Sequence, residues 1–143
     1  MPAQFLKELS VAARAQMWRR SLEARRMRVL LACVDDAVAG WVAFGACRDA
    51  DKDKQWAEVE ALYVLPSMWG EGVGKRLSDA AQHLLHDAGY RCIALWVLAE
   101  NRRAIEFYRR CGFLEDDSSG SRKTIRMGGA ELTEVRYVRG LID

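Results

Sequence analysis

The sequence has no long hydrophobic run, although 50% of its 143 residues are hydrophobic. A membrane-spanning helix needs about 20 consecutive apolar residues, and the apolar stretches here are only as long as a strand. Residues 1–9 also lack the basic start, apolar run and small-residue cleavage site of a secretory signal. We therefore predict a soluble, cytoplasmic protein with no membrane partner.

The chain also has little excess charge, few histidines and no paired cysteine motif. Its 22 Lys and Arg against 20 Asp and Glu give a net charge of +2, which argues against general binding to nucleic acid. The 4 scattered cysteines form no Cys-x-x-Cys pair, and His83 and His86 have no third ligand at metal spacing. We expect no metal site, and reduced thiols that are mostly buried. A single domain over residues 1–143 is long enough to bury a core without such cross-links.

Hydrophobic periodicity predicts helices and strands that alternate along most of the chain. Apolar residues at helical spacing predict helices over residues 10–28, 73–88 and 102–111. Short apolar runs predict strands over residues 29–34, 38–46, 56–65, 92–98, 113–115 and 132–138. The acidic, Ser/Gly-rich segment before the last strand is expected to be a loop. This order predicts a mixed α/β sandwich with helices packed on a sheet.

A glycine-rich turn stands between a predicted strand and a predicted helix, where residues 69–74 read WGEGVG. Glycines at a helix N-terminus let backbone N–H groups approach a phosphate, whose charge the helix dipole favours. Trp69 and Arg76 exclude a Walker A loop, and Lys75 excludes a dinucleotide-binding fingerprint. Two alternatives remain: a different phosphate-binding turn, or a turn that needs glycine only for its backbone flexibility.

Two motifs resemble one known family. The first is this turn with the residues before it, and the second is a segment that begins within the predicted strand 92–98. Residues 62–66 read LYVLP and residues 95–113 read LWVLAENRRAIEFYRRCGF. With the turn they resemble the acyl-CoA-binding core of the GNAT superfamily of N-acetyltransferases, over about residues 29–138. The resemblance implies an α/β fold of the α+β type, in which helices flank a mixed, mostly antiparallel central sheet. It also implies that the strands at about 57–65 and 92–98 separate in a V-shaped splay. It also implies acetyl-CoA as co-substrate.

The resemblance implies a cofactor site along this splay. Backbone amides of residues 70–75 would bind the CoA pyrophosphate, and the pantetheine arm would pair with the strand near residues 62–64. The Asn101 side chain would contact this arm, although it also fits an ordinary helix N-cap. The residues expected to bind acetyl-CoA are Leu62, Tyr63, Val64, Trp69, Gly70, Glu71, Gly72, Val73, Gly74, Lys75, Asn101, Ala104, Phe107 and Tyr108.

One position of this site departs from the family pattern. The family has Gln or Arg where this chain has Trp69. Because backbone amides do most of the binding, we expect the departure to matter little. The side chains of Lys75 and Arg76 either contact phosphate or are simply solvated.

Acetyl transfer to an amine needs a base, an oxyanion donor and an acid. An amine has a pKa of about 10.4 and must lose a proton before it attacks. Glu58 and Glu60 share a face of their strand and are the candidate bases. Glu58 stands where some members of the family, including histone-type enzymes, have their base, and Glu60 is the reserve candidate. Both also fit solvated residues on a half-exposed strand. A strand N–H near Leu62 or Tyr63 is the candidate oxyanion donor. Tyr108 is the candidate acid for the CoA thiolate, with an aromatic core residue as the alternative.

The sequence leaves the amine acceptor open between a small molecule and a peptide. Arg48 is a candidate contact for a substrate carboxylate. A basic cluster would suit a tRNA-directed, toxin-like acetyltransferase or form a solvated face, and it consists of Arg14, Arg19, Arg20, Arg25, Arg26 and Arg28. A non-catalytic acyl-CoA sensor is a further alternative. The family's usual N-terminal strand and helix are not found before residues 5–28, so we expect an open sheet edge that favours a homodimer.

Overall fold

The computed structural model describes residues 27–141. The elements, in chain order, are β1 (Met27–Val34), β2 (Ala37–Ala46), β3 (Trp56–Val64), η1 (Pro66–Met68), α3 (Val73–Asp87), β4 (Cys92–Leu98), α4 (Arg102–Arg110), β5 (Leu114–Glu115), β6 (Arg122–Met127) and β7 (Ala130–Gly140). In this part of the chain no helix is long and apolar enough to cross a membrane.

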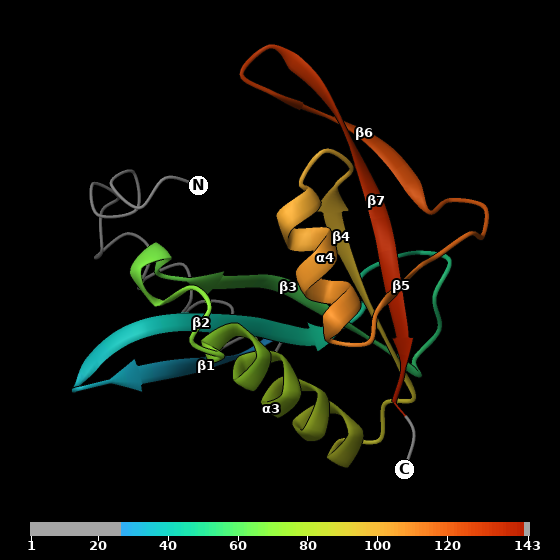
Figure 1. The fold of residues 1–143 in the computed structure, drawn as a ribbon. Coiled ribbons are helices and arrows are strands. Elements are labelled where there is room, and N and C mark those ends of the chain that lie inside the picture. The colour runs from blue at the N-terminus through green and yellow to red at the C-terminus, as the bar shows by residue number, and fades with distance from the viewer. Residues whose placement is uncertain (1–26, 142–143) are drawn as a thin grey trace.

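The strands form one mixed sheet on which both helices pack. The strand order is β1-β2-β3-β4-β7-β5, and β6 pairs with β7. Every neighbouring pair is antiparallel except β3 and β4, which are parallel and joined through α3. Figure 1 shows α3 and α4 on the same side of this sheet. The predicted mixed, mostly antiparallel sheet with flanking helices is confirmed.

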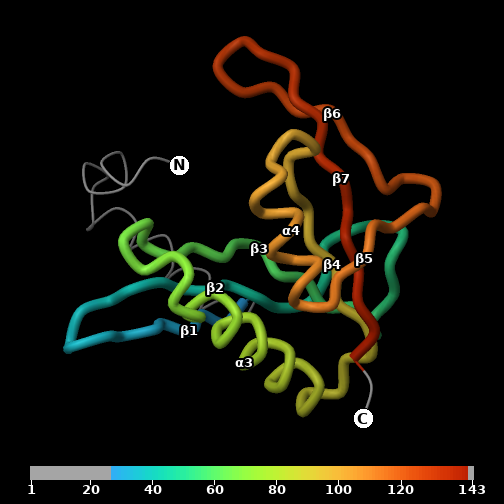
Figure 2. The backbone as a smooth tube through the Cα atoms, in the orientation of Figure 1, coloured from blue at the N-terminus to red at the C-terminus, as the bar shows by residue number. Residues whose placement is uncertain are grey.

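The predicted splay lies between the two parallel strands. Partner residues of β3 and β4 are Trp56 with Cys92, Ala57 with Ile93, and Glu58 with Ala94. Beyond the last of these pairs the strands separate, and Figure 2 shows their backbones diverging. The remaining residues of β3, Val59 to Val64, therefore present one backbone edge towards an opening rather than a strand.

The core lies between the helices and one face of the sheet. Val59 of β3 and Leu95 of β4 are buried there with Leu77, Ala81 and Leu85 of α3. Because side chains alternate between the faces of a strand, Glu58, Ala94 and Trp96 project from the opposite face. The helices thus lie on one side of the splay and the glutamates on the other.

The structure differs from the sequence-based expectation at two elements. Residues 122–127, expected to be a loop, form β6 and a hairpin with β7 that turns at Gly128 and Gly129, both at positive φ. The last two residues of the predicted helix 10–28, Met27 and Arg28, belong to β1 instead. The rest of that helix, with most of the basic cluster, lies outside the described residues.

The expectation of mostly buried thiols is also wrong. Cys111 is buried, whereas Cys47 and Cys92 are half-buried and Cys33 is exposed. Cys33 lies on β1, which forms one edge of the sheet in the described part of the chain. An apolar sequence context therefore did not predict burial at this edge strand.

Candidate functional site

The glycine turn brings the N-terminus of α3 to the open end of the splay. Gly72 is the N-cap residue of α3 with φ +82°, a conformation that glycine adopts readily. At Gly74 a Cβ atom would lie 2.9 Å from the ring of Phe107, so only glycine lets α4 approach this closely. No side chain of the described residues caps this terminus. The first N–H groups of the helix have no partner within the helix, and they suit an anionic ligand.

Trp69 holds a well-defined place beside this turn. Its indole Nε1–H donates to the backbone oxygen of Val64, the last residue of β3, over 3.0 Å. The guanidinium of Arg103, in the first turn of α4, lies 3.6 Å from the centre of its ring. Trp69 therefore links the end of β3 to the helix that follows β4. Sequence reasoning missed Arg103, because nothing in a local pattern links it to a residue 34 positions earlier.

The Lys75 side chain already has a partner. Its ammonium lies 2.8 Å from Asp79 one turn along α3, and this hydrogen bond raises the pKa of Lys75 above its ordinary value. Both groups are exposed, so the pair is a surface interaction. The structure therefore supplies a reason for Lys75 to point along its own helix.

Asn101 is the N-cap of α4, which is one of the two roles predicted for it. The side-chain oxygen accepts the backbone N–H of Ala104 over 3.1 Å. The residue is otherwise exposed. Contact of Asn101 with a pantetheine arm stays a prediction.

Tyr108 lies among aromatic rings on the core side of α4. Its ring meets those of Phe107 and Phe113 edge-on, at centroid distances of 5.3 and 5.9 Å. Burial raises the pKa of Tyr108 to about 12. The phenol therefore keeps its proton at neutral pH, which an acid must do and which an aromatic core residue would do equally well.

Glu58 and Glu60 converge on a single arginine. Arg48 donates to Glu58 from its backbone N–H over 3.1 Å, from Nε over 3.3 Å and from Nη2 over 2.9 Å, while its Nη1 lies 2.8 Å from Glu60. Phe44 pairs with Val59 and Ala43 with Ala61, so Glu60 is the extra residue of a β-bulge. Because Arg48 contacts both carboxylates, they lie on the same face of β3.

The two glutamates differ in their access to solvent. Glu58 is only 2% exposed, and both of its oxygens accept hydrogen bonds from Arg48. The alternative that Glu58 is a solvated residue is therefore wrong. The side chain of Glu60 is 12% exposed and that of Arg48 is 57% exposed, so the arginine covers the pair from the solvent side.

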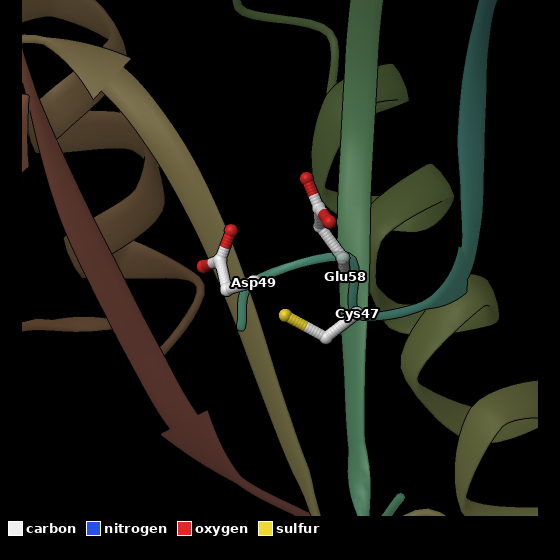
Figure 3. A group of neighbouring side chains, drawn as sticks. All are labelled: Cys47, Asp49 and Glu58. Atoms are coloured by element: carbon white, nitrogen blue, oxygen red, sulfur yellow. The ribbon is translucent and has the colours of Figure 1, made fainter. Parts of the chain in front are cut away.

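Cys47 and Asp49 lie next to Glu58 at the point where β3 and β4 diverge, as Figure 3 shows. One ligand atom from each of the three residues lies within 4.8 Å of the others. Glu58 is held by Arg48, and Asp49 accepts from Trp96 Nε1 over 3.0 Å. Burial, together with the nearby carboxylates, raises the pKa of Cys47 to about 11. The thiol therefore keeps its proton at neutral pH.

A buried arginine ties the segment that carries Arg48 and Asp49 to β7. Arg136 is 1% exposed and contacts Asp49 at 3.1 Å, Asp51 at 2.7 Å and Asp116 at 2.7 Å. Burial alone would raise the pKa of Asp116, but hydrogen bonds from Ser118 and Arg136 lower it to about 2. These contacts join residues up to 87 positions apart, so no local pattern could predict them.

A separate pocket of about 470 Å³ lies beyond the end of β4. It is lined by Leu98, Ala99, Glu100, Asn101, Arg122, Glu131, Leu132 and Thr133. Leu98 lies about 13 Å along β4 from Ala94, at about 3.3 Å per residue, so the pocket is distinct from the glutamate pair. The β6–β7 hairpin forms one wall, and this pocket was missed because the hairpin was not predicted.

Comparison with known proteins adds to this geometry. A family model described as the acetyltransferase (GNAT) family matches residues 3–113. The chain belongs to the GNAT family. The match contains β3, the glycine turn, α3, β4 and α4, which are the elements that form the splay.

Two curated relatives come from archaea. An uncharacterised N-acetyltransferase of Methanocaldococcus jannaschii is 39% identical over 64 residues, covering 45% of this chain and 28% of the relative. An uncharacterised N-acetyltransferase of Archaeoglobus fulgidus is 31% identical over 94 residues, covering 65% of this chain and 64% of the relative. The chain thus spans less than two thirds of the length of each.

Solved structures share the GNAT fold. Ribosomal-protein-alanine N-acetyltransferase from Brucella melitensis superposes with a TM-score of 0.76 at 19% identity, over 92% of this chain and 79% of that one. A Bacillus subtilis acetyltransferase in complex with CoA superposes with a TM-score of 0.67 at 20% identity, over 89% of this chain and 84% of that one. At these identities the likeness concerns the fold alone.

Proposed function

We propose that the protein is an acetyl-CoA-dependent N-acetyltransferase that acts on a primary amine of a small molecule or peptide. One observation carries this proposal more than any other. The parallel strands β3 and β4 part after Glu58 and Ala94, and the N-terminus of α3 stands at the open end. This arrangement offers a strand edge for an extended arm and backbone N–H groups for a phosphate.

We assign acetyl-CoA to the residues that line this opening. The amides of residues 70–75 would hold the pyrophosphate, and the β3 edge at Leu62 to Val64 would hold the pantetheine arm. Phe107 and Ala104 would form the helix side, with Asn101 at the start of α4. Support comes from the family match and from a solved relative of the same fold that contains CoA.

The proposed reaction is direct transfer. Acetyl-CoA supplies the acetyl group, and the acceptor nitrogen forms a bond to the acetyl carbon as the carbon–sulfur bond breaks. Glu58 or Glu60, directly or through water, accepts the proton that the amine loses. A β3 N–H near Leu62 or Tyr63 stabilises the carbonyl oxygen, and Tyr108 gives a proton to the departing thiolate. Both carboxylates contact Arg48, which lies 2.9 Å from Glu58 and 2.8 Å from Glu60.

Two other functions remain alternatives. A non-catalytic acyl-CoA sensor would bind acetyl-CoA without acetylating an amine. A tRNA-directed enzyme would use the basic cluster, of which the structure describes only Arg28. We also retain the expectation of a single domain over residues 1–143 and of a homodimer, with β1 as the edge strand in the described part.

The test combines binding with turnover. Free-thiol release from acetyl-CoA is followed with a panel of amines that includes free polyamines, amino sugars and a peptide with an N-terminal alanine. Amine-dependent thiol release with a matching acetylated product supports the enzyme. Saturable acetyl-CoA binding without such release, across the panel and with bulk tRNA, supports the sensor instead.

A further inference from the structure

Trp69 and Arg103 meet across the open end of the splay. Trp69 follows β3 and is fixed by the hydrogen bond from its indole to the Val64 oxygen. Arg103 belongs to the first turn of α4, which follows β4. Its guanidinium lies 3.6 Å from the centre of the indole ring, a close cation–π contact. The two residues therefore join the two strands at the end where they are farthest apart.

The position of Arg103 on α4 directs it towards the glycine turn. Residues four apart lie on the same face of a helix, so Arg103 shares a face with Phe107. The Phe107 ring is so close to Gly74 that a Cβ there would lie 2.9 Å away. The face of α4 that carries Arg103 thus packs on the first turn of α3.

The glycine turn carries an acid, and the first turn of α3 supplies two cations, Lys75 and the exposed Arg76. Glu71 is an exposed acid in the middle of the glycine turn, and the Lys75 ammonium lies 2.8 Å from Asp79. In the described structure the first turns of α3 and α4 contain no acidic residue. Since Lys75 is already paired, a phosphate at this turn would gain from a further cation that another element brings to it.

We propose that Arg103 is a cofactor-binding residue that donates to a phosphate of acyl-CoA and that Trp69 is its positioning residue. A guanidinium can stack with its flat face on an aromatic ring while the N–H groups on its edge donate to a phosphate. The cation–π contact therefore orders Arg103 without using its donors. Trp69, which departs from the family pattern, would then be the aromatic ring on which Arg103 of α4 stacks while it contacts the phosphate. The inference rests on the proposed function, because it takes the ligand to be acyl-CoA.

Calorimetric titration of the full chain with acetyl-CoA tests the assignment. The variant is Arg103→Ala, and the matched control is Arg102→Ala, which removes the same charge from the neighbouring position of the same helix. We expect Arg103→Ala to raise the Kd about tenfold, in the range of a lost hydrogen bond to a charged group, and to reduce the salt dependence of binding. Arg102→Ala should stay within about twofold, as a general electrostatic effect on an exposed position would.

A second pair of variants tests the role of Trp69. Trp69→Phe keeps an aromatic ring, whereas Trp69→Leu removes it, and both lose the same indole hydrogen bond. We expect Trp69→Leu to bind acetyl-CoA more weakly than Trp69→Phe, and this difference to vanish when each is combined with Arg103→Ala. Thermal melts confirm that the variants are folded.

The outcomes separate the inference from the function. Suppose that the unchanged protein binds acetyl-CoA saturably. The role of Arg103 is then overturned if the Kd of Arg103→Ala lies within twofold of that of the unchanged protein, or if Arg103→Ala and Arg102→Ala lose the same affinity. In both cases the proposed function stands. Absence of binding by the unchanged protein overturns the proposed function, and the inference with it.

Discussion

Replacement of Arg136 by methionine tests whether the buried ion network holds the fold together at the splay. Arg136 is 1% exposed and contacts the carboxylates of Asp49, Asp51 and Asp116. Its removal leaves three carboxylates around an apolar side chain. Breaking a buried pair in this way costs about 3–5 kcal/mol, because the remaining charges lose their partner. We expect the free energy of unfolding at pH 7 to fall by this amount.

The pH dependence of the free energy of unfolding measures the contribution of this ion network in a second way. The pKa of Asp116 is lowered from 3.8 to about 2 in the folded protein. Since a tenfold change in an equilibrium constant is about 1.4 kcal/mol, this difference stabilises the folded state by roughly 2 kcal/mol. A lowered folded-state pKa means that the contribution is complete above about pH 4 and is lost as the pH falls towards 2. In Arg136→Met this acid-dependent loss should shrink.

Urea unfolding followed by circular dichroism from pH 2 to pH 7 measures both effects. Arg126→Met is the matched control, since Arg126 pairs with Glu131 at 3.1 Å but its side chain is 78% exposed. The control should change stability by less than about 1 kcal/mol. If Arg136→Met is as stable as the control and loses stability to the same extent between pH 4 and pH 2 as the unchanged protein, the ion network does not stabilise the fold.

Three further predictions concern the site. Gly72→Glu should weaken acetyl-CoA binding in calorimetry, because it adds a carboxylate and strains a residue with φ +82°; undiminished affinity would mean that the turn is only structural. Tyr108→Phe should lower the rate of amine-dependent thiol release while the Kd of acetyl-CoA changes little, and an unchanged rate would remove Tyr108 from the acid role. Cys47, with a pKa raised to about 11, should be alkylated at pH 8 much more slowly than exposed Cys33, and peptide mass spectrometry that finds equal rates would contradict its neutral state.

Local sequence patterns predicted those parts of the fold in which hydrophobic periodicity or turn residues mark the element directly. The bounds of β4, Cys92–Leu98, match the prediction because nearly every residue is apolar, as in a strand covered on both faces. Asp35 and Asp36 both adopt positive φ in the turn between β1 and β2, which falls in the gap between the predicted strands 29–34 and 38–46. The strand β6 was missed because four of its six residues are exposed and charged or polar on both faces, which leaves no alternation to detect.

The sequence predicted where in the fold the candidate site residues lie, but not which side chains contact them. The family motifs placed Glu58, Glu60 and Tyr108 near the splay. They did not predict that Arg48 contacts both glutamates, or that Arg136 of β7 contacts Asp49 and Asp51 in the loop that carries Arg48. The β-bulge at Glu60 depends on how β2 and β3 pair, and Arg103 meets Trp69 where α4 packs on the first turn of α3. Such contacts follow from tertiary structure, for which spacing along the chain contains no information.

Hydrogen–deuterium exchange with and without saturating acetyl-CoA tests the central claim most directly, namely that the opening between β3 and β4 receives the arm of acyl-CoA. The account predicts slower exchange of backbone amides in residues 59–64 and 70–75, with no change in β1, which lies two strands away. Unchanged exchange in both segments, under conditions where calorimetry shows the cofactor bound, would contradict the claim and place the ligand elsewhere on the molecule.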